Sequence, residues 1–254
     1  MTPANLGVKA YWDSKPCGSL EPVARKAEFF QTHAELRYLR EPEIVPFAGF
    51  EKSRGQQVLE IGVGMGADFV RFAKAQAKIC GIDLSPRSLG LALRNARINH
   101  ISPTLLNADG ELLPFADESF DLVYSWGVLH HTSNIERALL EIHRVLRPQG
   151  ECRLMLYHRL SLVGLQCYIR YGLGKLRPFT PLSMLIAAHI ESPGTKAYTV
   201  REVKSLLGKF CKVEVRPIVT GYDVRFGRRR FAPRWMLRLI PDRLGWFLLV
   251  HAKK

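Results

Sequence analysis

The chain has 254 residues, 47% of them apolar, and a formal net charge of +14. This length and composition suffice to bury a full core, which excludes a disordered chain and predicts a soluble globular protein, most simply one elaborated domain. The N-terminal residues lack the apolar core of a signal peptide, and no apolar run approaches the roughly 18 residues of a membrane span. We therefore expect a cytoplasmic location.

The positive charge belongs to the C-terminal part. Residues 153–254 contain 20 Lys and Arg against 5 Asp and Glu, whereas residues 1–152 contain 17 against 18. Such asymmetry indicates an anionic partner: nucleic acid, a membrane surface or an acidic substrate. The charge alone does not choose among them.

The cysteines indicate neither a disulfide framework nor a zinc site. They are odd in number and scattered, and no two are spaced as Cys-x-x-Cys. We expect reduced, mostly buried thiols and no metal ion. The five are Cys17, Cys80, Cys152, Cys167 and Cys211.

The first 50 residues predict a helical cap appended to the core. Residues 21–39 have helical spacing, and Pro42 and Pro46 interrupt it. Tyr11 and Trp12 either close over a ligand as a lid or pack on the core, and the sequence leaves both open.

Residues 51–158 alternate strand, turn and helix, which predicts a doubly wound parallel sheet. The expected strands are 57–61, 77–83, 102–108, 120–126 and 150–158. The expected helices are 67–75, 86–99 and 135–146, the last closed by a turn at 147–150.

The remaining chain departs from this rhythm. Residues 159–198 form an apolar and basic segment, which we interpret as an insertion over the active face. Residues 199–254 predict a helix at 199–210, begun by a capping box of Thr199 and Glu202, then strands at 211–219 and 246–252 separated by a basic loop.

The stretch at 58–68 joins a buried strand to a helix through Gly62, Gly64 and Gly66. It satisfies the dinucleotide pattern G-x-G-x-x-A, and Asp83 follows at the distance of a ribose-binding residue. By itself this match fits several cofactors.

Two carboxylates, Glu60 and Asp68, flank this turn. A pyrophosphate on the first turn of the next helix would lie between them and be repelled, whereas a ligand carrying an ammonium and a sulfonium would be attracted. The charges therefore favour S-adenosylmethionine.

Two further segments fit the same ligand. Asp109 falls at a strand end, where its carboxylate would accept a hydrogen bond from the exocyclic amine of adenine. The turn at 125–132, with the sequence Ser-Trp-Gly-Val-Leu-His-His-Thr, directly follows the fourth strand.

In this order and spacing, these blocks resemble a class I S-adenosylmethionine-dependent methyltransferase of the type 11 group, similar to the quinone-biosynthesis methyltransferases. The resemblance covers residues 57–158. It implies a Rossmann-like, seven-stranded, mostly parallel sheet and S-adenosylmethionine as the cofactor. Gly110, where the group usually has alanine, and Asn134, where aspartate is common, depart from its pattern.

The resemblance also assigns positions around the cofactor. It implies that Asp83, with Leu84 beside it, binds the ribose hydroxyls and that Tyr11 is a candidate lid. The residues implied at the methionine moiety are Glu60, Gly62, Gly64 and Gly66, those at adenine are Asp109 and Gly110, and the turn beginning at Trp126 runs along the cofactor.

His130 and His131 are candidate general bases for an acidic acceptor proton, because an unperturbed imidazole pKa near 6.5 suits neutral pH. The alternative is that both pack or hydrogen-bond at the turn. Transfer from a sulfonium often needs only proximity, in-line orientation and a nucleophilic acceptor, so a base is optional.

The C-terminal part matches no substrate-defining pattern. Its run Arg228-Arg229-Arg230 lies among Phe226, Phe231 and the apolar stretch 235–240, which favours an amphipathic surface that meets a membrane or a hydrophobic substrate. Cys17 is a candidate for substrate contact, although a buried structural thiol is the simpler interpretation.

Our leading hypothesis is a methyltransferase for a small hydrophobic or amphipathic acceptor, whose pocket is formed by the insertion and the N-terminal cap. The alternatives are an RNA methyltransferase using the basic half, an NAD-dependent oxidoreductase, and a cofactor-binding protein without turnover. Nucleic acid is less favoured because the basic residues lie among aliphatic ones and no RNA-binding module is present. The oligomeric state is not predicted.

Overall fold

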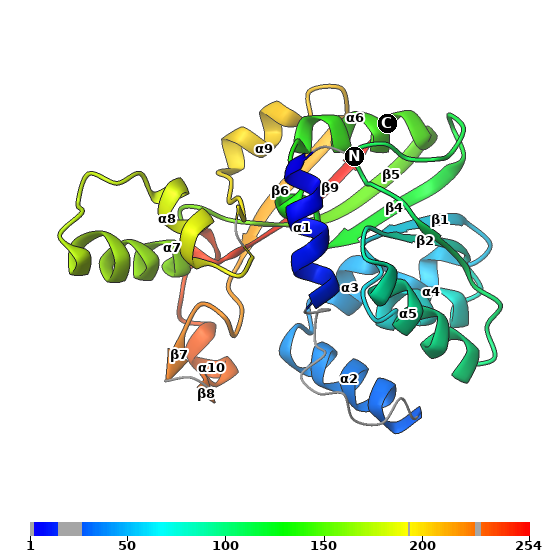
Figure 1. Cartoon of the computed structure of the whole chain (residues 1–254), viewed down its shortest axis with the longest axis horizontal. Helices are drawn as coiled ribbons and strands as arrows, with labels where there is room; N and C mark the ends of the chain where they lie inside the picture. The colour runs from blue at the N-terminus through cyan, green and yellow to red at the C-terminus, as the bar shows by residue number, and fades with distance from the viewer. Residues whose placement is uncertain (1–2, 15–26, 193, 227–229) are drawn as a thin grey trace. The chain divides into compact units, whose positions relative to one another are not determined.

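The computed structural model describes residues 3–14, 27–192, 194–226 and 230–254 (Figure 1). Its contacts group the chain into two compact units. Unit 1 comprises Met1–Trp126, Thr132–Arg153 and Lys253–Lys254, and unit 2 comprises Gly127–His131 and Leu154–Ala252.

Unit 1 holds the first four strands and the helices between them. Its elements are α1 (Pro3–Ser14), α2 (Ala27–Arg40), α3 (Ile44–Ala48), η1 (Phe50–Ser53), β1 (Gln57–Ile61), α4 (Ala67–Lys74), β2 (Lys78–Asp83), α5 (Pro86–Ile98), β3 (Thr104–Asn107), β4 (Phe120–Trp126) and α6 (Ile135–Val145).

Strand β5 (Leu146–Tyr157) runs from unit 1 into unit 2. The other elements of unit 2 are η2 (Leu129–His131), α7 (Leu162–Cys167), the π-helical turn η3 (Tyr168–Gly172), η4 (Leu173–Lys175), α8 (Leu182–His189), α9 (Val200–Leu206), β6 (Cys211–Ile218), β7 (Arg225–Phe226), β8 (Arg230–Phe231), α10 (Arg234–Leu237), η5 (Asp242–Leu244) and β9 (Phe247–Lys253).

Seven strands form one sheet in the order β3-β2-β1-β4-β5-β9-β6. β1 pairs in parallel with β2 on one side and with β4 on the other, and β2 pairs in parallel with β3. The strand order reverses between β1 and β4, the position at which doubly wound sheets bind ligands beyond the carboxyl ends of their strands. The predicted fold, a doubly wound and mostly parallel seven-stranded sheet, is confirmed.

The core of unit 1 follows from the apolar runs of its strands and helices. In β1, Val58 and Leu59 are fully buried. Phe69 of α4 and Ala92 of α5 are also fully buried and pack into one cluster with Val63 of the glycine loop. The two helices therefore hold the loop after β1 in place.

Several boundaries differ from those predicted. The helix expected at 21–39 is described from Ala27, and residues 15–26, including Cys17, lie outside the described residues. β3 is limited to four residues. The basic loop contains the short antiparallel pair β7 and β8.

The prediction that a turn at 147–150 separates the helix from the next strand was wrong. α6 ends at Val145, and β5 begins at once because Leu146 is extended, with φ −71° and ψ 138°. The chain turns inside the strand instead, at Gln149, whose φ is 67°.

Gly245 is required by a close approach to another backbone segment. An added Cβ would lie 1.9 Å from the carbonyl oxygen of Ile218. We expect Gly245→Ala to lower the melting temperature, because a backbone contact cannot relax by rotating a side chain. The control is Gly90→Ala in α5, whose Cβ meets nothing; it should be neutral or stabilise by about 0.5–1 kcal/mol. Equal melting temperatures for the two variants would contradict this account.

Candidate functional site

The loop after β1 has a backbone that favours glycine. Gly62, Gly64 and Gly66 all have positive φ, at 82°, 52° and 76°. A Cβ on Gly66 would lie 3.1 Å from the Cα of Ala92, whereas one on Gly64 would meet no protein atom within 4 Å. The loop is thus closed toward α5 and open at Gly64.

Asp83, at the end of β2, ties this loop to the next helix. Its Oδ2 accepts a hydrogen bond from the backbone N–H of Gly64 at 2.9 Å, and its Oδ1 accepts from that of Ser85 at 2.8 Å. Burial raises the pKa of Asp83, while these two N–H groups act to lower it. Ser85 is itself the N-cap of α5, accepting from the N–H of Ser88.

Glu60 is a buried carboxyl group with an unsatisfied oxygen. The residue is 4% exposed, and its Oε2 has no hydrogen-bond partner. Burial raises the pKa of Glu60 well above its usual range, and the nearby Asp68 raises it further. A buried carboxyl group of this kind is costly unless a donor or a cation binds it.

Asp68 corrects the charge argument made from the sequence. It is 2% exposed, and its Oδ2 accepts from Nη2 of Arg37 at 2.8 Å. The hydroxyl groups of Tyr38 and Tyr124 also donate to it, at 2.9 and 3.0 Å. Because Arg37 neutralises Asp68, only Glu60 of the two carboxylates keeps an oxygen without a partner.

Helix α2 supplies contacts that the sequence interpretation missed. Besides Arg37 and Tyr38, the residue just after it, Glu41, accepts from Nε1 of Trp126 at 2.6 Å through Oε2. Trp126 is 7% exposed and packs edge-on against Phe47. No spacing rule links positions so far apart in the sequence. The predicted position of Trp126 along the cofactor remains a prediction.

The end of α1 lies next to the Asp83 corner. Asp13 Oδ1 accepts from the hydroxyl of Ser85 at 2.5 Å, and Nη1 of Arg87 donates to the carbonyl of Asp13 at 3.0 Å. Tyr11 and Trp12 directly precede Asp13 in the chain. Both are half-buried, and their rings pack edge to face. This neighbourhood is compatible with either role predicted for Tyr11.

Asp109 begins the loop after β3. Its Oδ1 accepts from the N–H of Glu111 at 3.0 Å, which orders the turn around Gly110. Glu111, 3% exposed, accepts from the hydroxyl of Ser133 and the N–H of Asn134 at the start of α6. Nδ2 of Asn107 donates to the carbonyl of Leu84 at 3.0 Å. The loops after β2, β3 and β4 are therefore bonded to one another or to the next helix.

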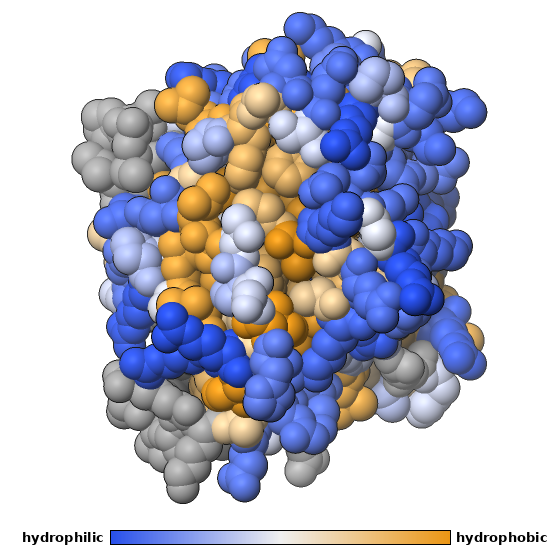
Figure 2. Space-filling view, turned by 90° about the vertical axis from the view of Figure 1, so that its right-hand side faces the viewer, coloured by the Kyte–Doolittle hydropathy of each residue, from blue (hydrophilic) through white to orange (hydrophobic). Residues whose placement is uncertain are grey.

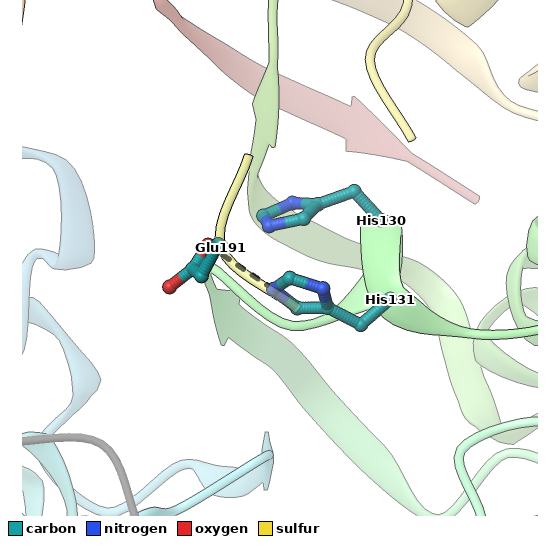
Figure 3. Close-up of side chains that lie close together, drawn as sticks. All are labelled: His130, His131 and Glu191. Carbon is teal, nitrogen blue, oxygen red and sulfur yellow. Dashed lines mark ion pairs between the residues drawn. The ribbon is translucent and has the colours of Figure 1, made fainter. Parts of the chain in front are cut away.

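A second group of polar residues lies in unit 2, at the turn after β4. His130, His131 and Glu191 point toward one another, and Figure 3 shows the two rings beside the carboxylate. Nε2 of His131 is 3.5 Å from Oε2 of Glu191, which also accepts from the hydroxyl of Tyr157 at 2.6 Å. Burial acts to raise the pKa of Glu191, but its pairing with His131 and Tyr157 outweighs burial and lowers that pKa.

The two histidines differ in their surroundings. Nδ1 of His131 lies 2.9 Å from the hydroxyl oxygen of Ser192 and 3.2 Å from that of Thr195. His130 is fully buried and stacked on Tyr157, and neither of its ring nitrogens has a hydrogen-bond partner. Burial, and after it His131 and Lys196, hold the pKa of His130 well below its usual range.

The same group offers three ligand atoms within 4.8 Å of one another. Ligands of one bound ion lie closer, because two atoms at 2.1 Å from a tetrahedral zinc ion are about 3.4 Å apart. Nε2 of His131 and Oε2 of Glu191, at 3.5 Å, already have about that spacing. A metal bound there would require Glu191 to turn from Tyr157 or to share its oxygen with it.

Comparison with known proteins agrees with this geometry. Residues 59–154 match the family model described as methyltransferase domain. The chain is 37% identical over 126 residues to the demethylmenaquinone methyltransferase of Tropheryma whipplei (strain Twist), covering 48% of this chain and 52% of that protein. It is 32% identical over 131 residues to the malonyl-[acyl-carrier protein] O-methyltransferase of Erwinia billingiae (strain Eb661), covering 52% and 50%. The chain thus spans about half the length of these curated relatives.

Among solved structures, a methyltransferase from Aquifex aeolicus, described as SAM dependent, has the same fold. It superposes with a TM-score of 0.55 at 16% sequence identity, covering 90% of this chain and 98% of that one. At this sequence identity the likeness shows the fold, a seven-stranded Rossmann-like sheet in the same order as in class I methyltransferases. Residues 59–154 are similar to methyltransferase domains of the type 11 group, which confirms the resemblance found in the sequence.

We expect Arg37→Ala to destabilise the protein by about 3 kcal/mol or more, because it leaves the buried carboxylate of Asp68 without its cation. The control is Arg40→Ala, three residues later on α2 and exposed to solvent. Urea denaturation at neutral pH measures both. A loss for Arg37→Ala no larger than that for Arg40→Ala would show that the pair does not stabilise the fold.

Proposed function

We propose that the protein is an S-adenosylmethionine-dependent methyltransferase that acts on a small hydrophobic or amphipathic acceptor. The observation that carries the donor assignment is Glu60, a buried carboxyl group with one oxygen unsatisfied beside a glycine loop. An ammonium group would satisfy that oxygen and favour the ionised carboxylate, whereas a pyrophosphate offers it no donor and would be repelled by the ionised form. In this proposal the open side at Gly64 receives the methionine moiety, and Asp83 binds the ribose hydroxyls.

The acceptor class is proposed from the names of two relatives and from the surface of unit 2. One relative is named for demethylmenaquinone and the other for malonyl-[acyl-carrier protein]. The two names differ although each relative aligns with about half of this chain, so these alignments do not identify the acceptor. The apolar surface of unit 2 favours the amphipathic class.

We propose His131 as the base that takes a proton from the acceptor, in preference to His130. The carboxylate of Glu191 would stabilise the imidazolium that forms on His131, and Ser192 and Thr195 fix its ring. His130 has no such partner, and burial opposes its protonation. His130 would then serve as packing for Tyr157.

Two other functions stay less favoured. For an RNA methyltransferase, the basic side chains of unit 2 would have to follow a phosphate backbone, and salt-dependent RNA binding would revive that proposal. For an NAD-dependent oxidoreductase, the ionised carboxylate of Glu60 would repel the pyrophosphate of the cofactor. A protein that binds the cofactor without turnover is tested by transfer of a labelled methyl group from S-adenosylmethionine to cell extract, which also identifies the acceptor.

We also propose that the protein associates with a membrane surface. Of the helices in the described part, none is both long and apolar enough to cross a membrane. Trp235 and Leu239 in the predicted amphipathic stretch are 66% and 77% exposed. Arg228 and Arg229 lie outside the described residues, so their contribution remains a prediction.

Glu60→Gln should weaken the binding of S-adenosylmethionine by tens of fold, since a charge-assisted hydrogen bond contributes about 1.5–3 kcal/mol. Burial raises the pKa of Glu60, so the free protein keeps this group protonated to higher pH. A bound cation favours the ionised form, so binding should release a proton and the affinity should rise with pH. Calorimetry in buffers of different ionisation enthalpy measures this release.

The control for this substitution is Glu51→Gln, an exposed carboxylate of η1. It should bind the cofactor like the wild type and release the same proton. The donor assignment is wrong if Glu60→Gln behaves like Glu51→Gln, or if NAD(H) binds while S-adenosylmethionine and S-adenosylhomocysteine do not.

His131→Ala should slow methyl transfer by about 10²–10⁴-fold, the usual contribution of a general base, without changing cofactor affinity. Glu191→Gln should slow it in the same direction and shift the pH–rate profile. His130→Ala is the control and should retain most of the rate. Equal rates for the two histidine variants would contradict the assignment of His131 as the base. Loss of activity on adding a chelator would instead indicate that His130, His131 and Glu191 bind a metal ion.

A further inference from the structure

The segment from α7 to α8 in unit 2 exposes an unusual amount of apolar side chain. Seven of the large apolar residues that are exposed in the described chain lie between positions 160 and 184. They are Leu160, Leu165, Ile169, Leu173, Leu176, Phe179 and Met184. All of them lie in the segment 159–198, which the sequence indicates to be apolar and basic.

Three of these side chains lie on the continuous helical run that α7, η3 and η4 form from Leu162 to Lys175. Leu165, Ile169 and Leu173 follow each other at intervals of four residues, so they form one stripe. The opposite face is buried, at Cys167 and Gly172, where a Cβ on Gly172 would lie 3.3 Å from Leu185 of α8. Figure 1 shows α7 and α8 with the connecting loop.

The tip of the segment is its most exposed part. Leu176 is 90% exposed and Phe179 96%. Leu176 also occupies the C-cap of η4 with φ 56°, a left-handed conformation in which glycine or asparagine is usual. Neither the fold nor the local backbone accounts for a leucine that is strained and turned to solvent, which points to a requirement outside the chain.

The charge of the segment is uniformly positive. The sequence has no aspartate or glutamate between Glu151 and Glu191. Arg170, Lys175 and Arg177 are exposed between the apolar positions. Exposed apolar area alone does not set the α7–α8 segment apart from the rest of the surface. The face drawn in Figure 2 also shows an apolar area, surrounded by hydrophilic residues. The combination with unopposed cations is what distinguishes α7–α8.

We propose that the α7–α8 segment docks on an anionic lipid bilayer. Leu176 and Phe179 would enter the boundary between headgroups and acyl chains, and Lys175 and Arg177 beside them would pair with lipid phosphates. RNA offers phosphates to the cations but no apolar medium for the two most exposed side chains. The proposed function enters this inference only as the reason for docking, because a bilayer would bring the protein to an amphipathic acceptor. The binding itself does not depend on methyl transfer.

Sedimentation of the full chain with lipid vesicles tests this proposal without any methyl transfer. We expect binding to vesicles of phosphatidylcholine and phosphatidylglycerol in equal parts, weakened by salt, and little binding to phosphatidylcholine alone. Lys175→Glu with Arg177→Glu should weaken it at least tenfold, and so should Leu176→Ser with Phe179→Ser. The matched control is Arg137→Glu with Leu140→Ser, an exposed pair on α6, which should bind like the wild type.

Three results would overturn the proposal. One is the absence of binding to the anionic vesicles, and another is equal binding by all variants. The third is that the variants instead lose affinity for RNA, or convert a dimer to a monomer in light scattering. Calorimetric titration of S-adenosylhomocysteine into each variant shows whether it is folded, and it also separates a failure of docking from a failure of donor binding.

Discussion

The hydrogen bonds of Asp83 constrain the donor half of this protein more than any other contact. A single carboxylate accepts from Gly64 in the loop after β1 and from Ser85 at the cap of α5. These two N–H groups belong to different crossovers of the sheet, so the distance between the glycine loop and the next helix is set by one side chain. The loop at Asp109 is attached to the same corner through Asn107, which donates to the carbonyl of Asp83.

The sequence was sufficient where chemistry is encoded locally. The glycine spacing, Asp83 and the strand–helix alternation each involve residues close in the chain, and the predicted sheet follows from them. Helix α6 was predicted for the same reason, because Ala138, Leu139 and Ile142 recur at helical spacing and are buried. The α9 capping box of Thr199 and Glu202 is present because both partners lie within one helical turn.

What the sequence could not supply are contacts between distant segments. Arg37 neutralises Asp68 across 31 positions, and Glu191 meets His131 across 60. No periodicity or spacing rule connects such pairs, so the charge of Asp68 was assigned to the ligand rather than to an internal ion pair. Element ends were missed for a related reason, since Leu146 is held extended by the sheet although the local residues favour a turn.

Strand β5 gives the division of the chain a further meaning. Within β5, the boundary between unit 1 and unit 2 falls between Arg153 and Leu154, and the match to the family model ends at residue 154. The segment that the family model matches therefore ends at this boundary, and the apolar, basic segment follows it. In such an arrangement, substitutions after residue 154 would alter the surface of unit 2 while leaving the glycine loop and the Asp83 corner as they are.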